Sequence, residues 1–82
     1  MDSTHFLRRL GPDPHDAGDT PGLAGCPDLW ELSTGDFAVI GIRSTVALAS
    51  VLPETASCGP DEEIVIVPRR ILTSAREDIP RE

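Results

Sequence analysis

The 82-residue chain contains no Lys, Asn, Gln or Tyr, and only 4% of its residues are aromatic. The absence of lysine excludes a lysine general base or Schiff-base nucleophile. Basic residues are also scarce, since 7 Arg stand against 14 Asp and Glu and leave a net charge of -7. A field of that sign repels phosphate backbones and anionic membrane surfaces. We therefore expect no direct binding to nucleic acid or to membranes.

Long apolar segments are absent as well. The longest run, Phe37 to Ile42, is six residues, whereas a helix that spans a bilayer needs about 20. Residues 1–10 lack the apolar stretch of a secretory signal peptide. We therefore expect a cytoplasmic protein with one small domain, because 82 residues at 39% hydrophobic content cannot build two cores.

Catalytic patterns are missing too. The chain has no histidine beyond residue 15, no Gly-x-Ser-x-Gly nucleophile turn and no glycine-rich phosphate loop. The carboxylates Asp61, Glu62 and Glu63 offer ligands for a hard cation, but alternate side chains of one strand point to opposite faces. We interpret them as a solvated entrance to a strand. The sequence thus predicts no enzyme and no cofactor.

The distribution of proline and glycine divides the chain. Residues 11–28 hold four Pro and four Gly and almost no apolar residue, so they cannot recover the entropy lost on ordering. We expect residues 1–25 to form a disordered tail and residues 26–82 to form the domain. Phe6, Leu7 and Leu10 would share one face of a helix, either as a frayed start or as a short peptide that folds on a partner.

Residues 26–82 predict the order ββαβα. A hairpin joins two strands, a helix capped by Ser44 follows, and a second helix begins at Pro68 after a third strand. The predicted ranges are strands 28–32, 36–42 and 62–67 and helices 45–52 and 68–79. A helix between strands 36–42 and 62–67 favours their parallel pairing. The expected fold class is α+β, with a small three-stranded mixed sheet and two short helices on one face.

Such a sheet has a second apolar face with nothing to cover it. Phe37 and Val39 point to one side of their strand, and Ala38 and Ile40 point to the other. Trp30, the single tryptophan, is either a core anchor or an interface hot spot.

Two arginines complete the set of candidate interaction residues, which is Trp30, Phe37, Val39, Arg69 and Arg70. Arg69 and Arg70 lie in the first turn of the last helix, where positive charge opposes the helix dipole. Either they pair with nearby acids of the chain, at Glu62, Glu63 or Asp28, or they contact the carboxylates of a partner.

Cys26 and Cys58 are the two thiols, and each begins a similar turn, Cys-Pro-Asp and Cys-Gly-Pro-Asp. They are independent structural thiols, a disulfide or redox pair, or metal ligands. His5 and His15 would complete a Cys₂His₂ set, but no pair has the close spacing of structural zinc sites. We therefore expect no metal site.

Linked blocks in residues 25–80 carry a resemblance. They are Gly25-Cys26-Pro27-Asp28, Glu31, Gly35 to Gly41, Cys58 to Glu62, Ile64-Val65, Pro68-Arg69 and Ile79-Pro80. With these blocks the chain resembles a family of small uncharacterised actinobacterial proteins of the Streptomyces type. In a related pattern the segment equivalent to residues 43–52 is more acidic and more clearly helical. The resemblance implies a regulatory or accessory role in the cytoplasm and no known activity.

These patterns favour a non-catalytic protein–protein interaction or regulatory accessory module of the bacterial cytoplasm. Its partner would be another protein, for example a basic DNA-binding regulator that suits its acidity, or a second copy in a homodimer. The alternative is a thiol-based redox or metal switch that uses Cys26 and Cys58.

Overall fold

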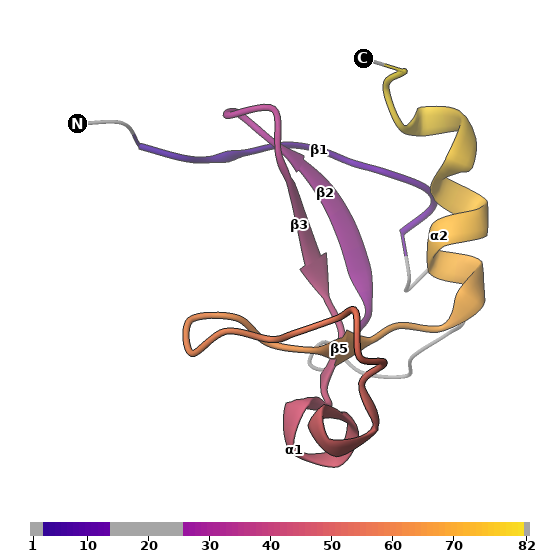
Figure 1. The fold of residues 1–82 in the computed structure, drawn as a ribbon. Coiled ribbons are helices and arrows are strands. Elements are labelled where there is room, and N and C mark those ends of the chain that lie inside the picture. Colours follow the sequence, from indigo (N-terminus) through magenta and orange to yellow (C-terminus); the bar gives the residue numbers. More distant parts are fainter. Residues whose placement is uncertain (1–2, 14–25, 82) are drawn as a thin grey trace.

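The structure is a computed structural model, and it describes residues 3–13 and 26–81. Figure 1 shows a small α+β fold in which one helix lies beside a twisted sheet. The elements in chain order are β1 (Phe6–Arg9), β2 (Asp28–Leu32), β3 (Phe37–Ile40), β4 (Ile42–Arg43), α1 (Thr45–Leu48), the 3₁₀ turn η1 (Ala49–Val51), β5 (Val65–Ile66), α2 (Arg69–Ala75) and the 3₁₀ turn η2 (Arg76–Asp78). None of these helices is long and apolar enough to cross a membrane.

β2 is the central strand of an antiparallel sheet with the order β1-β2-β3. The predicted hairpin between β2 and β3 is confirmed. The Leu32 N–H donates to the Asp36 carbonyl at 2.9 Å, and Gly35 adopts a φ of 94°, which an L side chain rarely tolerates. The turn residues therefore fix the register of the two strands.

This register assigns each side chain to a face. Leu29 lies opposite Val39, and Trp30 lies opposite Ala38. Because neighbouring side chains of a strand alternate, two faces follow, and we name them by what covers them. The helix face, against which α2 packs, presents Leu29, Glu31, Phe37 and Val39, and the open face presents Asp28, Trp30, Ala38 and Ile40.

The core is very small. Within the described residues the buried apolar side chains are Leu10, Leu29 and Ala75, with the half-buried Ile71 packed against them. Ile71 and Ala75 are four residues apart and so lie on one face of α2. Leu72, the neighbour of Ile71 on α2, is 51% exposed, because a helix of seven residues presents only a narrow stripe to β2.

Beyond β3 the chain leaves the sheet at Gly41 and forms a second ladder, in which β4 pairs antiparallel with β5. A Cβ at Gly41 would lie 2.7 Å from the Ile66 carbonyl oxygen and 2.7 Å from a Val67 methyl group. A glycine is therefore needed where the two ladders approach each other.

The α+β class, with a three-stranded sheet and two short helices, is confirmed, but the third strand is not the predicted one. Strands 36–42 and 62–67 were expected to pair in parallel across a helical crossover. Instead, Ile42 pairs with Ile66 in an antiparallel ladder of two residues. The helix over residues 45–51 holds only a four-residue α turn and a 3₁₀ turn, which is too short to return the chain for a parallel crossover.

Two details of the helices also differ from expectation. α1 lies beyond the end of the sheet instead of on the face that α2 covers (Figure 1). The Ser44 hydroxyl does not cap α1, because it donates to the Ile42 carbonyl at 2.9 Å.

The N-terminal segment corrects the predicted domain boundary. Residues 1–25 were expected to be a disordered tail, but Phe6–Arg9 form β1 and Leu10 is 3% exposed. β1 pairs antiparallel with β2, and the Leu10 N–H donates to the Leu29 carbonyl at 2.9 Å. The apolar residues therefore belong to a strand and its exit instead of a helix. Residues 1–2 and 14–25 of the predicted tail lie outside the described residues.

Replacing Leu10 by Ala should lower the free energy of unfolding by about 2–4 kcal/mol, as for other buried leucines. Leu7→Ala is the matched control, since Leu7 is 55% exposed and should change stability by less than about 0.5 kcal/mol. Urea unfolding followed by circular dichroism measures both. Equal, small effects would show that the N-terminal segment is not part of the core.

Replacing Gly41 by Ala should destabilise the fold by about 1–3 kcal/mol, because the added methyl group meets the Ile66 backbone. Gly59→Ala is the control, since the nearest atoms to its Cβ lie at an ordinary 3.4 Å. Thermal unfolding of the two variants gives the comparison, and a Gly41→Ala variant as stable as Gly59→Ala would contradict the close approach of the two ladders.

Candidate interaction surface

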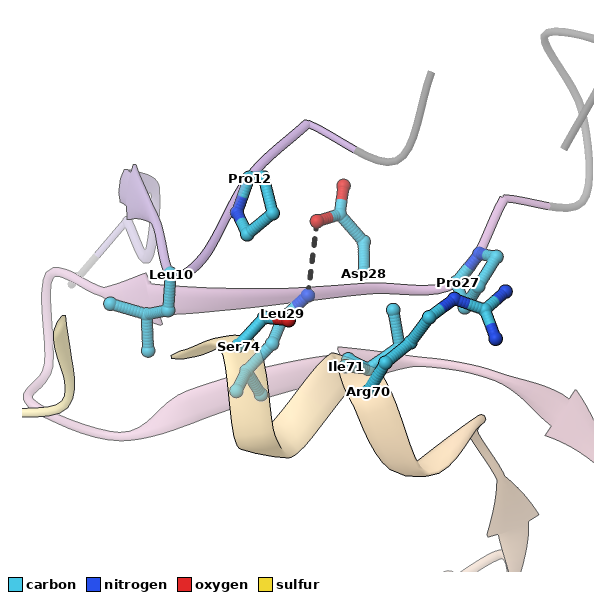
Figure 2. A pocket seen from close by; sticks show the side chains of 8 residues that line it. All are labelled: Leu10, Pro12, Pro27, Asp28, Leu29, Arg70, Ile71 and Ser74. Atoms are coloured by element: carbon cyan, nitrogen blue, oxygen red, sulfur yellow. Dashed lines mark hydrogen bonds between the residues drawn. The ribbon is translucent and has the colours of Figure 1, made fainter. Parts of the chain in front are cut away.

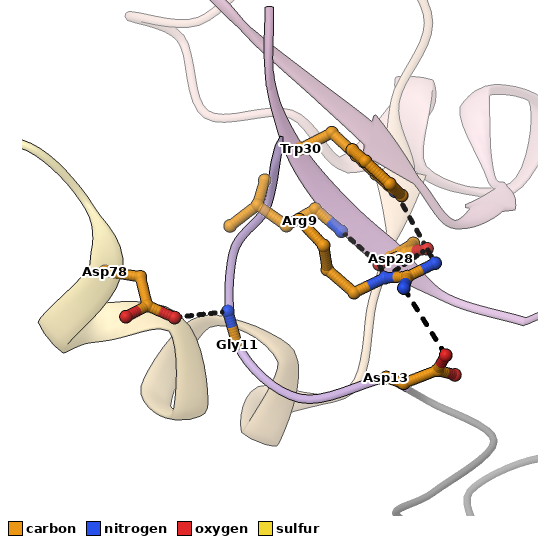
Figure 3. A network of polar contacts seen from close by, with 7 residues as sticks. Arg9, Gly11, Asp13, Asp28, Trp30 and Asp78 are labelled. Atoms are coloured by element: carbon orange, nitrogen blue, oxygen red, sulfur yellow. Dashed lines mark hydrogen bonds and ion pairs between the residues drawn. The ribbon is translucent and has the colours of Figure 1, made fainter. Parts of the chain in front are cut away.

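Trp30 lies at the middle of the open face and is held there by three neighbours. Its indole N–H donates to Asp28 Oδ2 at 2.9 Å. The Arg9 guanidinium carbon lies 4.6 Å from the centre of the indole ring, within range of a cation–π interaction. The Phe6 ring meets the indole edge to face, with centroids 5.4 Å apart and planes at 88°. The half-buried Trp30 is therefore both anchored and accessible (Figure 3).

Asp28 connects the members of this network. Arg9 Nε donates to Asp28 Oδ1 at 3.0 Å and Arg9 Nη2 donates to Asp28 Oδ2 at 3.0 Å, a two-pronged ion pair (Figure 3). The Leu29 N–H donates to the same carboxylate at 3.0 Å. The Asp28 carboxylate therefore accepts hydrogen bonds from Arg9 on β1, from the backbone of β2 at Leu29 and from the Trp30 indole. Such charge-assisted bonds fix geometry as well as adding energy.

The environment of Asp28 shifts its acidity. Burial by itself would raise its pKa, but the hydrogen bonds from Arg9, Trp30 and the Leu29 N–H, together with the Arg9 charge, hold the pKa of Asp28 below its ordinary value. A lowered pKa means that the ionised carboxylate stabilises the fold. This stabilisation is complete above the ordinary aspartate pKa of about 3.9 and is lost as the pH falls through the lowered value.

The segment after β1 joins this network to the helix side of the molecule. The Gly11 N–H donates to Asp78 Oδ2 at 2.8 Å, and Arg8 Nη2 donates to the Asp78 carbonyl at 2.6 Å. Gly11 has a φ of 85°, and a Cβ at this position would lie 3.4 Å from the Ala75 Cα. Figure 3 shows Gly11 facing Asp78 on one side of this turn and Arg9 and Asp13 on the other. Arg8 and Gly11 therefore bind η2, the 3₁₀ turn that follows α2, and hold it close to the sheet.

The open face also carries exposed apolar side chains. Phe6 is 55% exposed and Ile40 is 47% exposed, and the two flank Trp30 on neighbouring strands. Exposure is widespread elsewhere too. The other large exposed apolar residues are Leu7, Phe37, Val39, Ile42, Val46, Val51, Val65, Ile66, Leu72 and Ile79.

The structure separates the residues that the sequence grouped as one interface. Trp30 lies on the open face, whereas Phe37 and Val39 lie on the helix face, each 44% exposed at the edge of the sheet. Arg69 and Arg70 are exposed in the first turn of α2. Within residues 3–13 and 26–81 no ion pair joins Arg69 to the acids proposed for it. The predicted set therefore spans three surfaces.

One enclosed hollow lies between β2 and α2, with a volume of about 50 Å³ (Figure 2). Its walls include Leu10, Leu29, Ile71 and Arg70. This volume is well below the roughly 300–1,000 Å³ of small-molecule sites. A wider and shallower hollow of about 440 Å³ lies on the outer side of α2, between Leu72 and Pro80.

Cys26 and Cys58 are half-buried, and no disulfide joins them. Among the residues that the structure describes, no group of three or more His, Cys, Asp and Glu side chains is arranged to hold a metal ion. His15 lies outside the described residues, and the exposed His5 donates its backbone N–H to the Ser33 hydroxyl at 3.0 Å.

Sequence reasoning missed Phe6, Arg9 and Asp28 as members of the surface around Trp30. Asp28 lies two residues before Trp30 on one strand, and this spacing already placed both side chains on one face. Phe6 and Arg9 were assigned to a tail, and no local pattern reveals that a segment ahead of a proline- and glycine-rich stretch returns as a strand.

Comparisons of this chain with protein-family models, with curated proteins and with solved structures give no match. The resemblance to the actinobacterial family stays a prediction.

Replacing Asp28 by Asn should lower the free energy of unfolding by about 1–3 kcal/mol at neutral pH, because the ion pair with Arg9 is lost. The difference from wild type should shrink as the pH falls through the lowered pKa of Asp28, where the wild-type carboxylate also becomes protonated. Asp36→Asn, in the exposed turn, should show neither effect. Urea unfolding at a series of pH values tests this, and a deficit that does not vary with pH would contradict the role of the Asp28 charge.

Proposed function

We propose that this protein is a non-catalytic interaction module that binds another protein through the open face around Trp30. The observation that carries the proposal is the small core. Three apolar residues are buried among the described residues, whereas twelve large apolar side chains are at least 37% exposed. Soluble monomers rarely leave large contiguous apolar patches uncovered, and such patches mark binding surfaces.

The arrangement around Trp30 supports this surface over the others. Interface hot spots are enriched in Trp and Arg, and here a tryptophan carries an arginine stacked on its ring. The side chains are held in place by Asp28 before any partner arrives, which reduces the entropy lost on binding. Phe6 and Ile40 extend the apolar area on both sides.

Charge suggests the kind of partner. A net charge of -7 favours association with a basic surface and raises the rate of encounter. A basic DNA-binding regulator of the bacterial cytoplasm has such a surface, and the module would act on it as a regulatory accessory protein. The alternative is a thiol-based redox or metal switch that uses Cys26 and Cys58, which no disulfide joins in this structure.

Affinity purification from the native host, with the whole chain as bait, tests the proposal. Phe6→Asp and Trp30→Ala should lose a partner that wild type retains. Val46→Asp is the matched control, because Val46 is 96% exposed on α1 and gains the same charge away from the open face. Circular dichroism must show that the variants fold. The partner should also elute as salt is raised, since screening weakens attraction between opposite charges.

A partner that binds Phe6→Asp and Val46→Asp equally well would contradict the assignment of the open face. Two cysteines that form a disulfide or bind metal in anaerobically purified protein would favour the thiol switch instead, and mass spectrometry with metal analysis detects both.

A further inference from the structure

A strand edge is open at β3. Within residues 3–13 and 26–81, β3 pairs with β2 on one side and no strand pairs with its other side. Figure 1 shows β3 on the side of β2 away from α2. Phe37, Val39 and Ile40 are 44%, 44% and 47% exposed, so each of these residues is open to solvent over much of its surface.

The hydrogen-bond pattern identifies the backbone groups at this edge. The Leu32 N–H donates to the Asp36 carbonyl, so the pair two residues further along, Trp30 with Ala38, also exchanges backbone bonds. The N–H and C=O groups of Phe37 and Val39 therefore point away from β2. Another strand edge offers donors and acceptors at the spacing of these four groups.

The two edges of the sheet differ in how they resist such pairing. β1 carries Arg8 and Arg9, and its register shifts between Phe6 and Arg8. Charged side chains and bulges are the usual means by which proteins block edge-to-edge association. β3 reads Phe-Ala-Val-Ile and has neither a charge, nor a proline, nor a bulge.

We infer that a second copy of this chain pairs antiparallel with β3, so that two three-stranded sheets join into one of six strands about a two-fold axis at Ala38. In this register Phe37 lies opposite Val39 of the second copy, and the same pair occurs twice. Four backbone hydrogen bonds form, and each cross-strand pair joins an aromatic ring to a β-branched side chain.

The size of Ala38 and the bend at Gly41 limit the register in which two β3 strands can pair. Ala38 meets Ala38 of the second copy in a non-hydrogen-bonded pair, where strands approach most closely, at about 4.5 Å between Cα atoms. Alanine is the smallest residue of β3 and fits that position. Registers centred further along the chain would need Gly41, where the backbone has already turned to meet Ile66. The pairing therefore centres within β3.

The response to salt distinguishes this dimer from a complex with a basic partner. Each copy has a net charge of -7, so two copies repel each other and added salt should strengthen the pairing. A complex with a basic protein responds in the opposite sense. The inference does not depend on the proposed function, because it uses the edge of the sheet instead of the open face.

Sedimentation velocity from micromolar to millimolar concentration, at low and high salt, tests the pairing. Wild type should show a monomer–dimer equilibrium that shifts toward dimer as salt rises. Val39→Lys should weaken it at least about tenfold, because a charge enters the new sheet. Leu7→Lys adds the same charge on β1, at the opposite edge of the sheet, and it should leave the monomer–dimer equilibrium unchanged.

Val39→Pro provides a second variant that spares the fold. The Val39 N–H points away from β2, so its loss removes a bond of the dimer and none of the hairpin, as proline is tolerated at edge positions. Circular dichroism and Trp30 fluorescence should match wild type while the dimer weakens. Ala38→Pro, in contrast, removes a bond of the hairpin itself and should destabilise the monomer.

A disulfide reports the register directly. With Cys26 and Cys58 replaced by Ser, Ala38→Cys should link two copies under an added oxidant, since the expected Cα separation suits a disulfide. Ile40→Cys is the control on the same strand and face. Its two copies would lie about 13 Å apart, four residues along the strands, and should not link.

A strict monomer at millimolar concentration and high salt would overturn the inference, as would a dimer that Val39→Lys and Val39→Pro leave unchanged. If wild type is monomeric but keeps a partner that depends on Phe6, the inference fails and the proposed function stands. If the dimer depends on Val39 but no partner depends on Phe6, the inference stands and the proposed function fails.

Discussion

The ion pair between Arg9 and Asp28 is the interaction on which the rest of the structure depends. It joins the first strand to the central one across 19 residues of sequence, and it does so beneath the tryptophan that marks the open face. Without it, β1 would be held to β2 by backbone bonds, by the exposed Arg8–Glu31 ion pair and by the contact of Phe6 with Trp30. Removing Arg9 would leave the buried Asp28 carboxylate without its ion-pair partner, which costs more than the pair itself contributes.

This interaction explains how so small a core holds a fold. In the part of the chain that the structure describes, three buried apolar residues remove little surface from water compared with the entropy of ordering that part. Specific polar bonds therefore carry an unusual share of the stability, and the turn through Gly11 and Asp78 adds to them. Apolar side chains that other proteins bury are left at the surface, where they are available to partners.

Local patterns in the sequence predicted the elements well and their assembly poorly. The hairpin around Gly35 was correct because turn chemistry is local, and α2 was correct because Pro68 and the spacing of Ile71 and Ala75 are local as well. The predicted parallel pairing of the third strand was wrong. It required a long crossover helix after residue 44, and the length of that helix is set by packing and not by local composition. β1 was missed because its partner lies beyond a segment whose composition favours disorder. Trp30 was identified from its rarity alone, while its neighbours Phe6 and Arg9 could be found only from the tertiary structure.

The bonds between the first strand and the end of α2 also bear on how the chain folds. Arg8 and Gly11 reach Asp78 across 70 and 67 residues of sequence, respectively. Contacts of this separation are formed late, because a long loop must close before the bonds that reward closure can form. For a domain this small, mean sequence separation governs the folding rate more than size does. We therefore expect the hairpin to form before the bonds at Asp78, so that the two flanking segments of the chain meet over it last.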